Sequence, residues 1–153
     1  GITSGTTATT FSPNASCTRA QAVTFLWRAA GSPEPASTRN PFTDVKSDAY
    51  YYKAVLWAVE QGITTGTSAT TFSPHDECSR CQVVAFLWRV EGEPEAEYND
   101  AFDDVAEGKW YAEPISWALE MGITTGISEN EFGVHVPCNR AQIVTFLYRA
   151  YAK

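Results

Sequence analysis

The chain has 153 residues, which suits one compact domain, and 44% of them are hydrophobic, so we expect a buried core and no disorder. Its 11 Lys and Arg residues against 18 Asp and Glu residues give a net charge of −7, which argues against nucleic-acid binding because phosphate contacts need a basic face. No run of about 18 apolar residues is present, so no membrane insertion is expected.

Apolar residues at helical spacing predict five helices along the chain. In chain order they lie near residues 19–30, 49–61, 80–90, 110–121 and 140–151. Gly31, Gly62, Gly92 and Gly122 are placed to end the first four helices in a left-handed conformation. Loops such as residues 64–74 are rich in Thr, Ser and Gly, which favours tight turns and short β-like pairings.

The helices near 19–30, 80–90 and 140–151 share a start signal. Each is preceded by a residue that favours the N-cap position and carries Gln three positions later. The pairs are Thr18 and Gln21, Ser79 and Gln82, and Asn139 and Gln142. Such a pair predicts a capping box, in which the two residues satisfy each other's backbone N–H groups.

The chain repeats itself at steps of 61 and 60 residues, since a Gly-Ile-Thr motif begins at Gly1, Gly62 and Gly122. We expect one domain, residues 1–153, with a partial first repeat at 1–37 that holds only a second helix, a second repeat at 38–98 and a third at 99–153. A leading segment of about 27 residues would complete the first repeat. A helix-loop-helix unit cannot bury its own apolar face, so the repeats are expected to close an all-α, three-lobed bundle around a pseudo-threefold axis.

The order of motifs resembles the S-layer homology (SLH) module over nearly the whole chain. The motifs are Phe-x-Asp-Val, aromatic-Tyr, Gly-Ile-x-x-Gly, Phe-x-Pro and Thr-Arg-Ala-Gln. The resemblance implies a pseudo-trimeric all-α domain whose second helices form the central bundle. Grooves between repeats would bind a secondary cell-wall polysaccharide, often through a pyruvylated sugar, at the outer surface of a bacterium. The resemblance implies no cofactor and no catalysis.

This sequence departs from the SLH pattern in several places. Gln stands where Thr-Arg-Ala-Glu is usual in all three repeats, which removes a charge near each groove and hints at altered ligand chemistry. Cys81 replaces the motif Ala, and Phe132-Gly133-Val134 replaces Phe-x-Pro. The first repeat lacks its Asp-bearing segment, so at least one groove is expected to be incomplete.

Carried over by position, the resemblance assigns arginines, aromatic residues, loop glycines and aspartates to the grooves. They are Arg19, Arg80, Arg140, Trp110, Tyr50, Gly66, Gly126, Asp44 and Asp104. Arg can grip a pyruvate carboxylate with two parallel hydrogen bonds, and the first turn of a helix favours an anion. An indole face can cover a sugar ring, and glycine lets backbone amides approach a ligand. In the structural alternative, the arginines pair with Asp or Glu, and the aspartates cap a helix or tie down a loop.

Three cysteines occupy one equivalent position, directly before each second helix. They are Cys17, Cys78 and Cys138. Three equivalent sites cannot all pair with one another, and Cys is among the most buried residue types, so we expect buried free thiols. Two alternatives are less favoured: a local disulfide or redox pair between Cys78 and Cys81, and a zinc site that includes His75 and His135.

Two functions remain open from the sequence, and a third is disfavoured. The first is a non-catalytic anchoring module that binds cell-wall polysaccharide. The second is a protein-interaction or self-association module of a surface protein. An enzyme is not expected, because the chain has only two His residues and lacks both a nucleophile motif and a catalytic carboxylate pair.

Overall fold

The computed structural model describes residues 1–152. Within this range it holds five helices and no extended strand, which confirms the all-α prediction. They are α1 (Arg19–Ala29), α2 (Tyr52–Glu60), α3 (Arg80–Val90), α4 (Ala112–Glu120) and α5 (Arg140–Tyr151). Helices α2 and α4 begin two to three residues later than expected, because the residues before them form turns and their N-caps, Tyr51 and Tyr111, offer no side-chain hydrogen bond.

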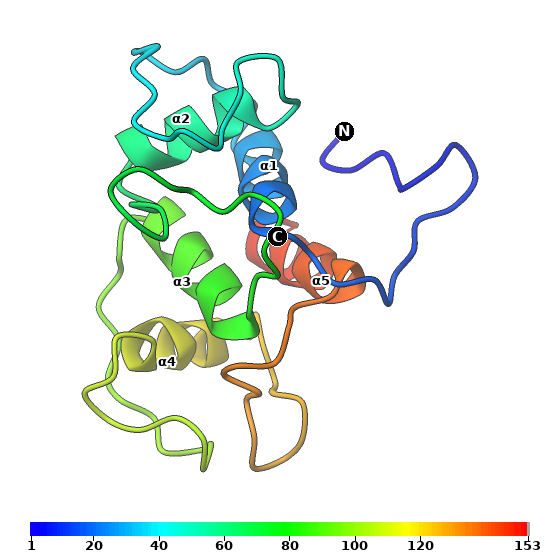
Figure 1. Cartoon of the computed structure of the whole chain (residues 1–153). Coiled ribbons are helices and arrows are strands. Elements are labelled where there is room, and N and C mark those ends of the chain that lie inside the picture. Colours follow the sequence, from blue (N-terminus) through cyan, green and yellow to red (C-terminus); the bar gives the residue numbers. More distant parts are fainter. Residues whose placement is uncertain (153) are drawn as a thin grey trace.

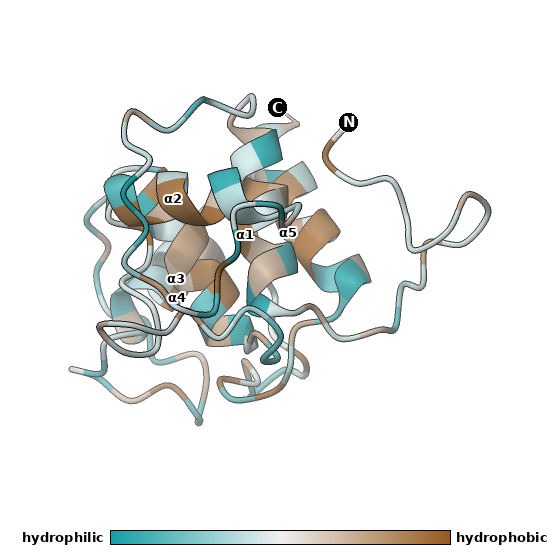
Figure 2. Ribbon diagram, turned by 45° about the horizontal axis from the view of Figure 1, so that its top comes forward, coloured by the Kyte–Doolittle hydropathy of each residue, from teal (hydrophilic) through white to brown (hydrophobic). Residues whose placement is uncertain are grey.

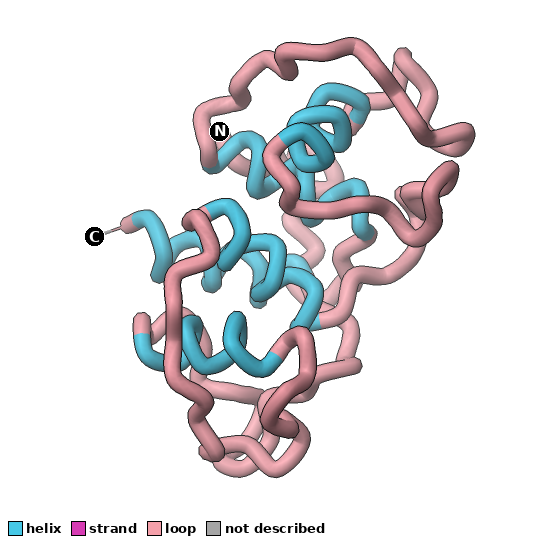
Figure 3. The backbone as a smooth tube through the Cα atoms, turned by 90° about the vertical axis from the view of Figure 1, so that its left-hand side faces the viewer, coloured by secondary structure: helices cyan, strands magenta, loops and turns pink. Residues whose placement is uncertain are grey.

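The second helices α1, α3 and α5 meet near the middle of the molecule, while α2 and α4 lie at opposite ends (Figure 1). Helix α2 packs on α1, and α4 packs on α3, so two of the three second helices are covered by the first helix of the repeat that follows them. Long loops wrap the outside of these helices (Figure 3). Figure 2 shows that the apolar residues are concentrated in the helices.

All three predicted capping boxes are present. Thr18 Oγ1 accepts the N–H of Gln21 at 3.1 Å, and Gln21 Oε1 accepts the N–H of Thr18 at 3.0 Å. Ser79 with Gln82 and Asn139 with Gln142 make the same two bonds. At the other helix ends, the four predicted stop glycines all have positive φ, for example +71° at Gly62.

The backbones of three cysteines close the bundle at its centre. Cys17 N–H donates to the carbonyl of Cys138, Cys78 N–H to Cys17, and Cys138 N–H to Cys78, each at 2.8 Å. This closed cycle joins the three repeats with the same bond three times, which confirms the pseudo-threefold arrangement. The β-like pairings are isolated bridges beside this ring, such as Thr18 with Glu77, and lie outside the loop at 64–74 where we expected them.

The cysteines are free and buried, as expected. Burial raises the pKa of Cys17 to about 11, against a smaller lowering by Arg140, and raises that of Cys138 to about 12 with a further contribution from Cys17. Among residues 1–152, no three His, Cys, Asp or Glu side chains are grouped to hold a metal. His75 and His135 instead pack edge-on against Tyr51 and Tyr111, with ring centroids 6.1 and 6.2 Å apart.

We expect the thiols of the native protein to react slowly with thiol reagents at pH 8. A thiol with a pKa near 11 is thiolate for only about a thousandth of the time at that pH, and the thiolate is the reactive form. Thiol counting with a chromogenic disulfide should therefore find slow labelling in buffer and four reactive thiols in denaturant. Rapid labelling of one cysteine in the folded protein would contradict this burial.

Candidate functional site

The motif arginines each reach from one repeat to the next. Arg19 Nε donates to the carbonyl of Phe72 at 2.9 Å, and Arg80 Nε donates to the carbonyl of Phe132 at 2.9 Å. Arg140 Nε closes the cycle by donating to the carbonyl of Phe11 at 2.8 Å. Each guanidinium also lies 4.8 to 4.9 Å from the ring centroid of the same phenylalanine. These arginines therefore brace the contacts between repeats.

These three arginines are almost fully buried, with exposed fractions of 5%, 3% and 4% for Arg19, Arg80 and Arg140. None of them pairs with a carboxylate, since the ion pair found among residues 1–152 is Lys53 with Glu34, at 2.6 Å. These arginines thus stabilise the fold by hydrogen bonds to carbonyl oxygens and by contacts with aromatic rings, and not by the ion pairs considered from the sequence. Burial lowers the pKa of Arg19 and of Arg80, against opposing contributions from Cys78 and Cys138 respectively.

Two matching grooves lie where these braces meet the second helices. Groove A, of about 360 Å³, is lined by residues 3–6, by Arg140, by Tyr50 and by the α1 residues Gln21, Thr24, Phe25 and Arg28. Groove B, of about 390 Å³, is lined by residues 124–127, by Arg80 and by Asn139, Ala141, Gln142, Thr145, Phe146 and Arg149 of α5 and its N-cap. The two sets share most positions of the repeat, Tyr50 is found in groove A alone, and neither set contains an acidic residue.

Each groove holds a second arginine that was not predicted from the sequence. Arg28 and Arg149, in the last turns of α1 and α5, line grooves A and B, and Arg89 is their counterpart in α3. Each donates to the carbonyl of the motif isoleucine of its own repeat, at 2.8 to 3.3 Å. The available signal was an arginine that recurs nine residues after each motif arginine.

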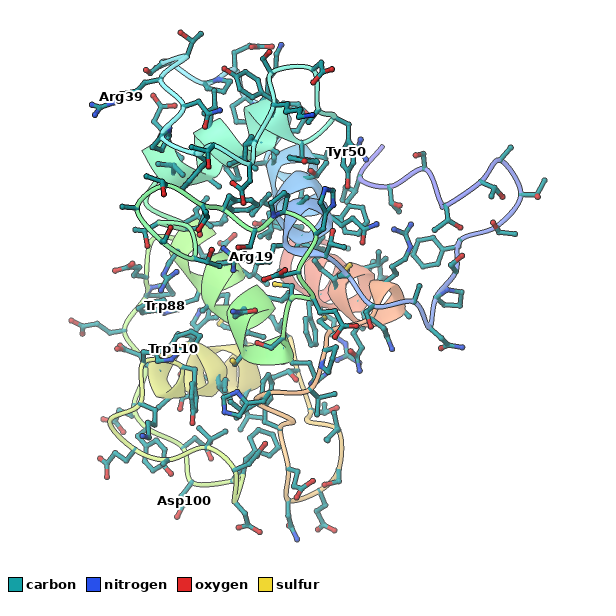
Figure 4. All side chains as sticks on the ribbon, in the orientation of Figure 1. Arg19, Arg39, Tyr50, Trp88, Asp100 and Trp110 are labelled. Atoms are coloured by element: carbon teal, nitrogen blue, oxygen red, sulfur yellow. The ribbon has the colours of Figure 1, made fainter. Side chains whose placement is uncertain are left out.

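The two candidate stacking residues occupy different surroundings. Tyr50 and Trp110 are 61% and 56% exposed, and each packs edge-on against the tyrosine that follows it. Tyr50 borders groove A, and burial, followed by Tyr51, raises its pKa against lowering by Arg28 and Arg140. Trp110 lines a separate cavity of about 420 Å³ beside Trp88 at the start of α4 (Figure 4). The structure therefore brings Tyr50 and Arg140 together and keeps Trp110 outside grooves A and B.

The motif aspartates tie down the loops behind the grooves. Asp44 accepts the N–H groups of Phe72 and Ser73 at 2.9 and 2.8 Å. Asp104 accepts those of Phe132, Gly133 and Val134 at 2.8 to 3.0 Å. Burial acts to raise the pKa of Asp104, but these backbone hydrogen bonds outweigh it and lower the pKa below its ordinary value. Each aspartate thus fixes the phenylalanine whose carbonyl receives a motif arginine.

The loop glycines are required by packing. Gly66 and Gly126 have φ of +85° and +82°. A Cβ added at Gly66 would lie 2.6 Å from Cε1 of Phe42, and one added at Gly126 would lie 2.6 Å from Cε1 of Phe102. Gly126 also lines groove B. The glycines therefore let the phenyl ring of the Phe-x-Asp-Val motif sit directly against the loop.

Comparison with protein families finds that the profile of the S-layer homology domain matches residues 1–23, 41–83 and 101–144. Among curated relatives, an endoglucanase of Bacillus sp. (strain KSM-635) is 35% identical over 80% of this chain. A surface-layer 125 kDa protein of Lysinibacillus sphaericus is 32% identical over 85%, and a cell surface protein of Thermoanaerobacter kivui is 31% identical over 72%. The matched regions span only 13%, 11% and 15% of these relatives' lengths. No helix among residues 1–152 is long and apolar enough to cross a membrane.

Proposed function

Because the chain belongs to the S-layer homology family, we propose that it is a non-catalytic module that anchors a larger protein to the bacterial cell surface. Its ligand is an acidic, pyruvylated cell-wall polysaccharide bound in grooves A and B. The wide range of relatives supports this proposal. An endoglucanase, a surface-layer protein and a cell surface protein share this region, and the region makes up only a small part of each of them. A module common to such different proteins fits attachment better than any one reaction.

The observation that carries the proposal is the concentration of arginine without carboxylate in the grooves. The protein has a net charge of −7, yet Arg28 and Arg140 face groove A, and Arg80 and Arg149 face groove B, with no acidic residue in either lining. Arginine has five N–H donors, and the bonds to carbonyl and hydroxyl oxygens use only some of them. The remaining donors suit an anionic substituent. Repulsion by the acidic surface is screened beyond about 10 Å.

Tyr50 adds a surface for the sugar ring at groove A. It is exposed at the edge of the groove that holds both arginines, so an apolar sugar face can stack on it while the acidic group meets the guanidinium groups. Groove B has no aromatic residue at the matching place among residues 1–152. We therefore propose groove A as the stronger site.

The test replaces the last-turn arginines, because the motif arginines also brace the fold. We expect Arg28→Gln with Arg149→Gln to weaken binding to the wall at least about tenfold, since each lost charged hydrogen bond is worth about 1.5–3 kcal/mol. The measurement is cosedimentation with purified sacculi of the host, before and after chemical removal of the polysaccharide. Arg39→Gln is the control that removes one arginine outside the grooves, because Arg39 lies in the exposed linker (Figure 4).

Binding that survives removal of the polysaccharide, or equal binding by the double variant and the control, would contradict the proposed function. Retained helical signal in the double variant would show that the loss is not caused by unfolding.

Self-association is a second candidate function, and one surface favours it. Helix α5 presents Val144, Leu147, Tyr148 and Tyr151 around an apolar hollow of about 300 Å³ that also contacts Ile2. Tyr148 is 68% exposed there. An exposed apolar patch of this kind can mark a protein interface. The mass of the protein in solution across a concentration series distinguishes the two functions, since anchoring alone predicts a monomer at every concentration.

A further inference from the structure

The glutamines of the capping boxes use only one end of their side-chain amide group in the cap. Gln21 and Gln142 lie at the third position of α1 and α5, and each uses Oε1 to accept the N–H of its N-cap residue, at 3.0 Å in both cases. A backbone N–H can only donate, so the oxygen must be the atom that meets it. The amide NH₂ is therefore the end that is left for the groove. Gln21 lines groove A and Gln142 lines groove B.

This orientation adds an amide donor to the arginine donors of each groove. In groove A the charged or amide side chains are Arg28, Arg140 and Gln21, and in groove B they are Arg80, Arg149 and Gln142, together with the N-cap Asn139. A glutamate at the same position could cap the helix equally well with one oxygen. Its second oxygen would then present a negative charge and an acceptor to the groove. The choice of Gln thus removes a negative charge from each groove and puts a donor in its place without changing the helix cap.

We propose that Gln21 and Gln142 determine the specificity of the grooves for a sugar substituent that offers only acceptor oxygens, a carboxylate, over a neutral group that offers hydroxyl donors. The inference rests on the proposed function and adds the residue that selects the ligand. A carboxylate can accept from an arginine and from the glutamine NH₂ at once. A hydroxymethyl group in its place has a single oxygen and no charge, so it makes fewer and weaker hydrogen bonds with the same donors.

The experiment uses one variant that carries both Gln21→Glu and Gln142→Glu, and Gln61→Glu serves as the control. Gln61 is exposed at the C-cap of α2 and lines neither groove, so its substitution places one new carboxylate outside the grooves, against the two inside them in the double variant. The probes are the purified wall polysaccharide of the host and the same polymer after its carboxylates have been reduced to hydroxymethyl groups. The readout is the dissociation constant for each polymer, measured by calorimetry, with the unfolding midpoint as a check on the cap.

We expect the wild type and Gln61→Glu to prefer the native polymer. We expect the double glutamate variant to bind the native polymer at least about tenfold more weakly, because each new carboxylate lies close to that of the ligand. Its preference for native over reduced polymer should shrink, which loss of a cap alone would not cause.

The outcomes separate this inference from the function on which it rests. If the double glutamate variant keeps the wild-type preference while Arg28→Gln with Arg149→Gln loses binding, the anchoring function stands and the role of the glutamines is wrong. If the wild type binds both polymers equally, the glutamines select no carboxylate and the inference fails. If the wild type binds neither polymer, both proposals fail.

Discussion

A variant that carries both Arg80→Ala and Arg140→Ala is expected to lose most of its folding stability. Each arginine is almost fully buried, donates to a carbonyl of the next repeat and lies against two phenylalanine rings. A buried charge-assisted hydrogen bond contributes about 1.5–3 kcal/mol, and a desolvated cation–π contact contributes about 2 kcal/mol. Two such losses approach the entire stability of a typical domain, which is about 5–15 kcal/mol.

Urea unfolding followed by circular dichroism measures this effect. The matched control is a variant that carries both Arg28→Ala and Arg149→Ala. Arg28 is half-buried and Arg149 is exposed, and each donates one hydrogen bond to a carbonyl. We expect the control to remain folded with a loss of about 2 kcal/mol or less. Equal midpoints for the two variants would show that the motif arginines do not brace the repeats.

This expectation changes how binding data on the family motif must be interpreted for this protein. Loss of wall binding after substitution of Arg80 or Arg140 does not by itself locate the ligand, because the same substitution loosens the loop that forms the groove. Arg28 and Arg149 border the same grooves without closing the cycle between repeats. They are therefore the positions at which binding and folding can be separated.

The fold could be predicted from the sequence because its signals are local and repeated. The capping pairs, the stop glycines and the apolar spacing each act within a few residues, and three copies make a chance match improbable. The starts of α2 and α4 were the exceptions. The helical spacing runs from residues 49 and 110, but no side chain caps a helix there, so the chain forms a turn first.

The candidate site was harder to predict because its contacts join distant residues. Arg140 meets Phe11 across 129 positions, and no local pattern tells which carbonyl it reaches. The aspartates show the same limit, since Asp44 could cap a helix or hold a loop, and only the fold reveals the N–H groups of Phe72 and Ser73 beside it. Tyr50 and Trp110 match in the sequence, yet only Tyr50 borders one of the two grooves.

Duplication of residues 41–61 directly in front of Gly1 is expected to raise the unfolding temperature. In the present structure α1 and α3 are covered by α2 and α4, whereas α5 exposes its equivalent face. Val23 and Val84 are fully buried, but their counterpart Val144 is only partly buried. Gly1 occupies the same position of its repeat as Gly62, and the added segment would end in the residue that precedes Gly62. The added helix would therefore enter its loop as α2 does, and it would pack on α5 as α2 packs on α1.

The added segment would also give the loop that holds Phe11 the contacts that the other two loops already have. Phe72 and Phe132 are fully buried because the Phe-x-Asp-Val motif covers their loops, while Phe11 is only partly buried. A third copy of that motif would bring a carboxylate to the N–H groups of Phe11 and Ser12. Burial of about 100–150 Å² of apolar surface together with these bonds should contribute about 3–5 kcal/mol, or an increase of about 10 °C for a chain of this size.

Calorimetry of the extended protein tests this expectation, with a control in which the added copy carries Phe42→Ala and Asp44→Ala. The control keeps the helix that covers α5 but lacks the two side chains that serve the loop, so it should recover only part of the increase. A full increase in the control would mean that the helix alone stabilises the bundle. No increase in either protein would mean that the apolar face of α5 is not shaped for this helix, and would favour self-association as the role of that face.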